Sequence, residues 1–318
     1  MKVRCWGVRG SIPAPCSTPQ IEQKILNALL DAPTIGPGDR AAAEKYVRSL
    51  PLNGRGTWGS NTPCIEVRTQ AGDLLILDAG SGLRLLGMAL MQEAFGRGQG
   101  RAAILLSHTH WDHIQGWPFF TPFYVAGNHF EVYGCHEDLE ERLRLQQDPR
   151  FFPVSLDDLP ATIHFERLQG PLQICDGHIA LAWMEGDHPA RSFVFKVQAD
   201  GKTFIYASDV EYKEPQGPYY ERCVEFYRNA DLLLFDAQYI HQEVLEKKYN
   251  WGHSSILTGI DIAAKAGVRR ILFSHYDPFQ DDDTVEEIFQ DSLRYAQERL
   301  PHPERQMILA YEGLELQV

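Results

Sequence analysis

The stretch that most constrains what this chain can fold into is the run of six residues at 108–113, which reads His-Thr-His-Trp-Asp-His. The apolar segment directly before it predicts a short buried strand. Side chains at the carboxyl end of such a strand form ligand sites in layered α/β folds. His108 and His110 are two residues apart, so extended backbone points both toward one metal ion. Asp112 and His113 follow at once and can turn to a second ion beside the first.

This H-x-H-x-D-H pattern resembles the metallo-β-lactamase superfamily, which carries a two-metal site at one edge of an αββα sandwich. The resemblance continues in four other places, each a strand or short loop that ends in a ligand-type side chain. They are Asp78 after the strand 74–77, His188 in Gly-Asp-His, Asp209 after the segment 203–208, and His275 after the segment 271–274. The resemblance implies an α/β fold of the αββα type, with residues 1–318 as a single domain.

The resemblance also implies a set of seven metal ligands, while Asp78 orients them from behind. One ion is expected on His108, His110 and His188, and the other on Asp112, His113 and His275, with Asp209 bridging both. Imidazole and carboxylate ligands without cysteine suit Zn²⁺ best here, with Mn²⁺ or Fe as alternatives. Two such divalent ions share a bridging hydroxide that serves as the nucleophile. The residues expected to act in catalysis are Asp112, Asp209 and His253.

His253 belongs to a second motif, Trp-Gly-His-Ser-Ser at 251–255, which stands just before a predicted helix. The motif resembles one found in the phosphodiesterase branch, typified by tRNA 3′-processing nucleases and cyclic-nucleotide phosphodiesterases. A phosphodiester leaves as an alkoxide, and His253 can supply its proton or hold a phosphate oxygen. Asp236, at the end of an apolar run, can orient His253. The simpler reading is that His253 is only a neighbour of the helix cap.

The leading interpretation is a dinuclear metal phosphodiesterase acting on a small nucleotide, cyclic nucleotides included. The first alternative is a tRNA 3′-end endoribonuclease. It is disfavoured because no Gly- and Lys-rich arm lies between His113 and His188, and because the net charge is −13. The second is a thioester or lactone hydrolase, and the third a non-catalytic sensor or scaffold. Asp209 argues against β-lactamases proper, where the resemblance implies a cysteine among the second ion's ligands.

The composition is that of an ordinary globular protein, with 44% hydrophobic and 23% charged residues. No apolar run approaches the roughly 20 residues that span a bilayer, and the first residues do not read as a signal peptide. The six cysteines form no C-x-x-C pair, so we expect them reduced. We therefore expect a cytoplasmic protein with a small phosphodiester substrate, and neither an extended nucleic acid nor a membrane as partner.

Residues 17–56 depart from the pattern and predict a helical insertion near the N-terminus. Ile21, Ile25 and Leu29 recur at helical spacing, and residues 41–50 predict a second helix after a Pro- and Gly-rich break. Such a segment is either a surface decoration, or a lid or homodimer contact near the site.

Further expectations concern the surroundings of the site. The aromatic stretch 117–124 forms either a pocket wall or core, and Arg9 and Asn61 either contact phosphate or serve as turn residues. Residues 307–316 are expected to close the fold as one last strand. The histidines outside the motifs are His129 and His241, expected near the pocket, and His136, His164, His178 and His302, expected at the surface.

Overall fold

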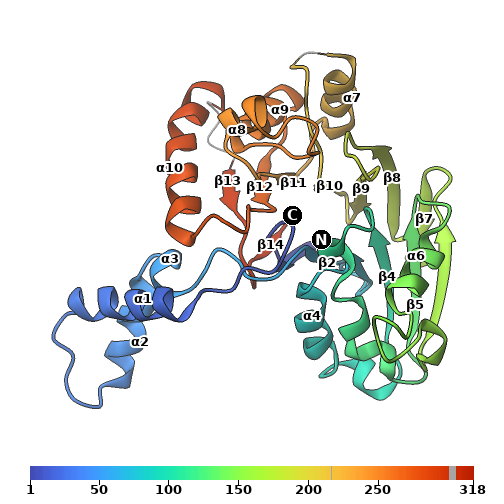
Figure 1. Cartoon of the computed structure of the whole chain (residues 1–318), viewed down its shortest axis with the longest axis horizontal. Coiled ribbons are helices and arrows are strands. Elements are labelled where there is room, and N and C mark those ends of the chain that lie inside the picture. The colour runs from blue at the N-terminus through green and yellow to red at the C-terminus, as the bar shows by residue number, and fades with distance from the viewer. Residues whose placement is uncertain (216, 301–305) are drawn as a thin grey trace.

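The computed structural model of the protein describes residues 1–215, 217–300 and 306–318, and within them two seven-stranded sheets pack face to face (Figure 1). The first sheet consists, in spatial order, of β14 (Glu315–Gln317), β1 (Lys2–Gly7), β2 (Cys64–Arg68), β3 (Leu74–Leu77), β4 (Arg101–Leu106), β5 (His129–Gly134) and β6 (Thr162–Arg167). The second consists of β13 (Gln306–Leu309), β12 (Arg270–Ser274), β11 (Leu232–Asp236), β10 (Lys202–Ala207), β9 (Phe193–Ala199), β8 (Ile179–Glu185) and β7 (Leu172–Ile174).

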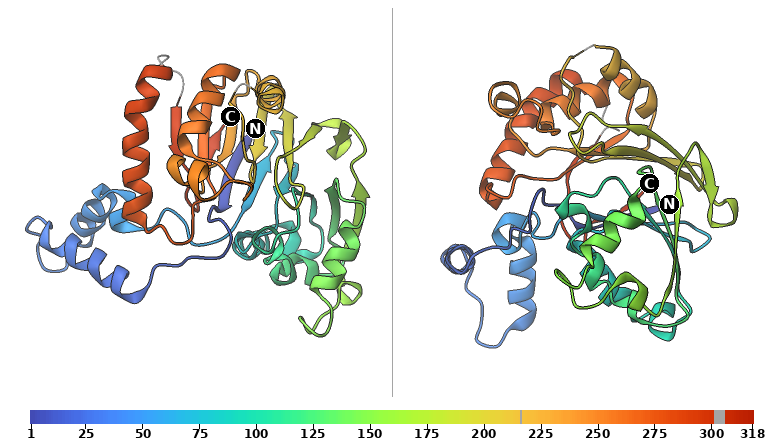
Figure 2. Two further views of the ribbon diagram at one scale, coloured as in Figure 1. Left: turned by 45° about the horizontal axis from the view of Figure 1, so that its top comes forward. Right: turned by 45° about the vertical axis from the view of Figure 1, so that its right-hand side comes forward.

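Helices cover the outer face of each sheet, which completes the predicted αββα sandwich (Figure 2). The first sheet carries α4 (Gly82–Leu90), α5 (Trp111–Ile114) and α6 (Leu139–Gln146). The second carries α7 (Pro218–Tyr227), α8 (His241–Glu246), α9 (Ile256–Ala266) and α10 (Asp282–Arg299). Among these helices and those of residues 17–56, none is long and apolar enough to cross a bilayer.

The central strands are apolar throughout because both of their faces are covered. Strands β3 and β11 contain only buried residues, as parallel strands between two layers do. Strands β3, β4 and β5 run parallel, and so do β10, β11 and β12. The carboxyl ends within each set therefore lie at one edge of their sheet, and the predicted ligands other than His188 follow these ends.

The aromatic stretch 117–124 belongs to the hydrophobic core between the first sheet and its helices. Trp117, Phe120 and Phe123 are fully buried there, so the pocket-wall interpretation of these rings is wrong. Within the stretch, Phe119 and Tyr124 are exposed. The sequence could not distinguish the two interpretations, because aromatic residues next to a site are equally suited to line a pocket or to fill the hydrophobic core.

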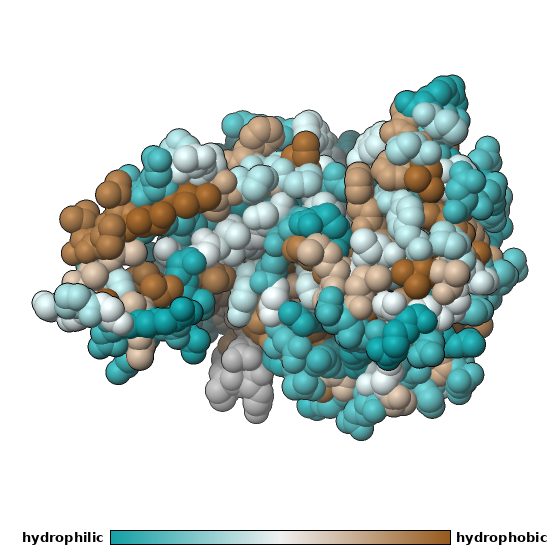
Figure 3. Space-filling view, turned by 90° about the horizontal axis from the view of Figure 1, so that it is seen from below, coloured by the Kyte–Doolittle hydropathy of each residue, from teal (hydrophilic) through white to brown (hydrophobic). Residues whose placement is uncertain are grey.

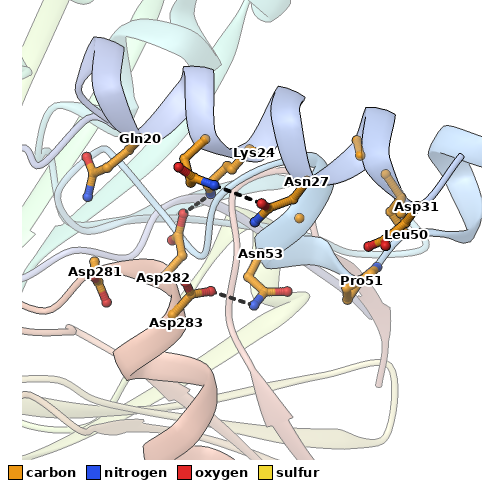
Figure 4. Close-up of a pocket in the computed structure, with 13 residues that line it drawn as sticks. Gln20, Lys24, Asn27, Asp31, Leu50, Pro51, Asn53, Asp281, Asp282 and Asp283 are labelled. Atoms are coloured by element: carbon orange, nitrogen blue, oxygen red, sulfur yellow. Dashed lines mark hydrogen bonds and ion pairs between the residues drawn. The ribbon is translucent and has the colours of Figure 1, made fainter.

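The predicted helical segment extends from the body as an arm made of α1 (Thr18–Leu30), α2 (Arg40–Ser49) and α3 (Leu52–Arg55) (Figure 1). No residue between 11 and 58 is buried. The arm is fastened to the start of α10 by polar contacts (Figure 4). Lys24 pairs with Asp282, and Asn53 Nδ2 donates to Asp283 at 2.9 Å.

The C-terminal strand expected at 307–316 is divided into two strands that belong to different sheets. β13 pairs with β12 in the second sheet, and β14 pairs with β1 in the first. Between them the chain turns at Gly313, whose φ of +90° favours glycine. The N–H of Gly313 donates to the carbonyl of Cys5 at 2.8 Å, which fixes the crossing. The apolar run looked continuous because the sequence does not show which sheet a strand joins.

Candidate metal centre

The site lies where several strands end at neighbouring edges of the two sheets. Asp78 follows β3, Asp209 follows β10 and His275 follows β12, and all three have positive φ, at 59°, 56° and 69°. Such backbone is costly for residues other than glycine and clusters at functional sites. It turns each chain segment sharply at the strand end, where the side chains converge.

A first cluster joins the predicted ligands His108, His110, His188 and Asp209, whose ligand atoms all lie within 4.8 Å of one another. His188 Nε2 lies 3.1 Å from His110 Nδ1, and His108 Nε2 lies 3.6 Å from Asp209 Oδ2. His110 is exposed and the other three are buried. The cluster therefore opens to solvent on the side of His110.

A second cluster joins Asp112, His113, His275 and the same Asp209, again within 4.8 Å. His275 Nε2 lies 3.1 Å from Asp112 Oδ2 and 3.2 Å from Asp209 Oδ1. All four residues are buried. The seven residues predicted as ligands thus converge on two adjacent groups that share Asp209. Their roles as ligands stay predictions.

Hydrogen bonds behind the clusters fix the imidazole rings. Asp78 Oδ2 lies 2.7 Å from His113 Nδ1 and accepts hydrogen bonds from Tyr206 and Ser107 at 2.6 and 2.7 Å. His188 Nδ1 lies 3.0 Å from the carbonyl of Gly252. In both rings these bonds occupy Nδ1 and leave Nε2 facing the cluster, as outer partners do at metal sites.

The side chains fit a divalent metal ion. His108 Nε2 is buried and has no hydrogen-bond partner within the described part of the chain, a costly state that a metal ion would relieve. Burial lowers the pKa of His108 well below 6.5, so its imidazole is neutral. Burial acts to raise the pKa of Asp209, but His113 and His275 outweigh it and hold that pKa well below 3.8. A neutral imidazole at His108 beside an ionised carboxylate at Asp209 is a pair of ligands that Zn²⁺, Mn²⁺ and Fe take.

His253 lies at the edge of both clusters, oriented by a buried carboxylate. Its Nδ1 is 2.8 Å from Asp236 Oδ2 and 3.9 Å from Asp209 Oδ2. Asp236 also accepts the N–H of Asp209 at 3.1 Å, so one carboxylate positions both residues. The predicted contact of Asp236 with His253 is present. The cap of α9 is Ser255, whose hydroxyl accepts from the N–H of Thr258, so His253 has no part in capping.

Three residues of the site were not singled out from the sequence. The N–H of Ser11 donates to Asp112 Oδ2 at 2.7 Å. A Cβ atom at Gly10 would lie 2.7 Å from His275 Nδ1, and one at Gly252 would lie 2.0 Å from His188 Nδ1. Both glycines are therefore required for close approach of the backbone to an imidazole. The available signal was that Gly252 stands in the motif at 251–255 and Gly10 in a similar run, Trp-Gly-Val-Arg-Gly-Ser, at 6–11.

Two residues considered for phosphate binding have structural roles instead. Arg9 is buried, and its guanidinium donates to the carbonyls of Gly59, Asp277 and Gln280. Asn61 donates from Nδ2 to Glu312 at 2.9 Å. Both side chains hold loops together and are not free to meet a substrate.

The histidines outside the motifs lie outside both clusters. His129 begins β5, at the opposite end from the site, and its ring bonds to Gly127, so its expected place near the pocket is wrong. His241 contacts Ser255 at 3.2 Å, beyond the clusters. His136 is buried rather than at the surface, because its ring packs on Phe193. His164 and His178 are exposed as expected, and His302 lies outside the described residues.

Comparison with known proteins agrees with this geometry. The family model described as "Beta-lactamase superfamily domain" matches residues 74–276, well over half of the chain. Ribonuclease Z of Prochlorococcus marinus (strain NATL1A) is 33% identical over 78 residues, which cover 24% of this chain and 22% of that protein. The chain therefore matches less than a quarter of the length of that relative.

Solved structures resemble the fold over nearly the whole chain. The metallo-beta-lactamase fold protein YhfI from Bacillus subtilis has a TM-score of 0.63 and 17% identity, over 99% of this chain and 98% of that one. A diphosphatase from the PhnP family has a TM-score of 0.59 and 18% identity, over 100% and 97%. Because the family model matches more than half of the chain and the αββα sandwich agrees with it, the chain belongs to the beta-lactamase superfamily.

Proposed function

We propose that the protein is a phosphodiesterase that uses two divalent ions, zinc foremost, to hydrolyse a small nucleotide, with cyclic nucleotides as the first class to test. The observation that carries the proposal is His253, buried at the edge of both clusters and held by Asp236. Thioesters and lactones make less demand for a proton donor at this place than an alkoxide leaving group does.

Divalent ions held by the two clusters would supply Lewis-acid stabilisation of the phosphoryl oxygens and a water of lowered pKa. The residues of the chain do the rest. Asp209 holds the two clusters together, and Asp78 and Gly252 keep the imidazoles turned inward. Asp236 accepts the Nδ1 proton of His253, so the Nε2 edge is left to give a proton to the leaving oxygen.

Two further observations support a small phosphoester as the substrate. The relatives with printed activities include a ribonuclease and a diphosphatase, which act on phosphate esters or anhydrides. Residues 114–187 contain four arginines, no lysine and twelve Asp or Glu. That stretch is poorly suited to clamp a long polyanion. The ribonuclease Z relatives keep tRNA 3′-end cleavage as the second candidate.

A substrate panel tests the proposal with protein loaded separately with Zn²⁺ and Mn²⁺. We expect hydrolysis of bis-p-nitrophenyl phosphate and of at least one cyclic mono- or dinucleotide, and none of the β-lactam nitrocefin. Faster turnover of a thioester or lactone than of every phosphodiester would show that the chemistry was assigned wrongly. A higher kcat/KM for precursor tRNA than for every small diester would establish the second candidate instead.

A further inference from the structure

An exposed tryptophan stands beside His253 on an aromatic and cationic surface that the proposed chemistry does not use. Trp251 is 53% exposed, and the ammonium of Lys248 lies 3.8 Å from the centre of its ring. Lys248 is also 5.0 Å from the ring of Tyr239. The ring of Tyr239 in turn lies 5.6 Å from that of His253 and 6.4 Å from that of Trp251. The buried ring of Tyr239 thus connects Trp251 and Lys248 to the proposed proton donor.

The backbone that carries Trp251 is tied to the metal centre. Glu211 is buried, and its two carboxylate oxygens accept the N–H groups of Asn250 and Gly252 at 2.9 and 3.0 Å. The carbonyl of Gly252 then bonds to His188 in the first cluster. Trp251 lies between Asn250 and Gly252 in the chain. It is therefore held in place by the same contacts that orient His188, a predicted ligand.

The charge at this surface is uncompensated. Lys248 forms no ion pair with any carboxylate of residues 1–215, 217–300 or 306–318, although the chain as a whole has a net charge of −13. A cation over one face of an indole is attracted by the electrons of the ring, and its positive charge can attract an anion to the same place. Nucleic-acid bases stack on such rings whatever their identity, because every base has a π-face.

We propose that Trp251 and Lys248 form the subsite that holds the nucleoside part of the substrate, with the base stacked on the indole. This inference rests on the proposed phosphodiesterase function and names its specificity determinant. It explains how an acidic protein selects a nucleotide without a basic groove, because one stacked ring and one cation replace a row of phosphate contacts.

Two diesters that release the same p-nitrophenolate test the subsite: thymidine 5′-(p-nitrophenyl phosphate), and methyl p-nitrophenyl phosphate, which lacks a base. The ratio of their kcat/KM values measures the benefit of the nucleoside, which is the base together with its sugar. We expect the wild-type protein to favour the thymidine diester. Trp251→Ala should reduce that ratio roughly 5- to 150-fold, the range of base stacking on an aromatic ring, and Trp251→Phe should retain most of it.

Phe151 provides the matched control, because it is 66% exposed and lies beneath Arg150 in the same kind of pair. Phe151→Ala should leave the ratio unchanged. A wild-type ratio near one, or an equal ratio in Trp251→Ala, would overturn the subsite while leaving the phosphodiesterase function intact. If neither these two diesters nor any phosphodiester of the substrate panel is hydrolysed, the proposed function fails. Calorimetric titration with thymidine 5′-monophosphate then decides the subsite alone: weaker binding by Trp251→Ala supports it, and equal binding refutes it.

A second, independent observation is the apolar surface of the arm. Large side chains of α1 and α2 are exposed on it, over about half the circumference of α1, and Figure 3 shows that hydrophobic atoms gather on the arm, at the left of the view. They are Ile21, Ile25, Leu26, Leu29, Leu30 and Val47, with exposures between 48% and 83%. Together they expose on the order of 700 Å², close to the roughly 800 Å² that each partner buries in a stable interface. Patches of this size on a soluble protein mark interaction sites.

The distribution of charge points to a second copy of the chain as the occupant, meeting arm to arm. Residues 17–56 carry five Lys or Arg and four Asp or Glu, so the arm has a net charge of +1 and the rest of the chain −14. Contact between the acidic remainders of two chains is opposed by charge repulsion. Contact between two arms, each with a net charge of +1, meets almost no repulsion. We infer that the arm is the interface of a symmetric homodimer.

Analytical ultracentrifugation across a range of concentrations tests the dimer. We expect the wild-type protein to dimerise and Ile25→Glu/Leu29→Glu to be monomeric. Leu145→Glu, at a 58% exposed apolar residue of α6, should remain dimeric. A monomeric wild-type protein, or a dimer that survives the double substitution, would contradict the inference.

Discussion

At the scale of single residues, Asp209 is the side chain on which both clusters depend. Its two oxygens face His108 on one side and His113 and His275 on the other. Asp209→Ala removes a shared carboxylate and the negative charge that allows two dications to lie close together. We expect the variant to bind at least one metal ion fewer per chain, measured by elemental analysis, and to lose nearly all turnover. Asp157→Ala, at an exposed carboxylate, is the control. Full activity with undiminished metal content would refute the prediction that both metal ions share Asp209.

His253 is the residue whose role is chemical rather than structural in our proposal. His253→Ala should retain the metal content and lower kcat for a poor leaving group by roughly 10²–10⁴, the contribution of a general acid. The loss should shrink for p-nitrophenolate, which needs little protonation. The control is His241→Ala, at a histidine outside the clusters. Metal loss in His253→Ala would show that His253 has a structural role, and equal losses for good and poor leaving groups would indicate phosphate binding.

At the scale of elements, the attachment of the arm to α10 depends on one carboxylate. Burial acts to raise the pKa of Asp282, but hydrogen bonds from Lys24, Trp58 and Thr57 lower it below 3.8. The ionised form is therefore the stabilising one. The ionised carboxylate contributes fully to the stability of the fold above about pH 3.9, the pKa of Asp in the unfolded chain. This contribution is lost as the pH falls through the lower pKa that Asp282 has in the folded chain.

We accordingly expect Asp282→Asn to destabilise the protein at pH 7 by about 2 kcal/mol, the scale of hydrogen bonds to a charged group. The difference in Tm from wild type should shrink below pH 4. Thermal unfolding followed by circular dichroism between pH 3 and 8 measures both. Asp283→Asn is the control, because this neighbouring carboxylate is exposed and accepts a hydrogen bond from Asn53. It should lower the free energy of unfolding by less than Asp282→Asn does. A difference that does not depend on pH would show that the charge of Asp282 is not what fastens the arm.

At the scale of the whole molecule, the metal centre joins the two sheets. His108 follows a strand of the first sheet, whereas Asp209 and His275 follow strands of the second. Ions bound there stabilise only the folded chain, by about 2.7 kcal/mol at a hundredfold excess over Kd. Dialysis against a chelator should therefore lower Tm by several degrees, and added Zn²⁺ or Mn²⁺ should restore it. An unchanged Tm after complete removal of metal would argue against a site that bridges the sheets.

The sequence by itself determined which His and Asp side chains follow buried strands, and its resemblance to a known family implied the sandwich. Apolar runs that end in His or Asp are local patterns, and a strand buried on both faces has to be apolar along its length. For that reason the segments ending at Asp78, Asp209 and His275 could be placed at the edge of a sheet before any coordinates were considered. The contact of Asp236 with His253 followed from the same reasoning.

Only the tertiary structure decided matters that depend on residues distant in sequence. It assigned Arg9 and Asn61 to loop contacts, and it divided the last strand between the two sheets. It also set Trp251 beside His253 through the carboxylate of Glu211, some 40 residues earlier in the chain. Hydrogen-bond partners of this kind are chosen by proximity in three dimensions, and a polar side chain looks the same in sequence whether it will meet a substrate or a neighbouring loop.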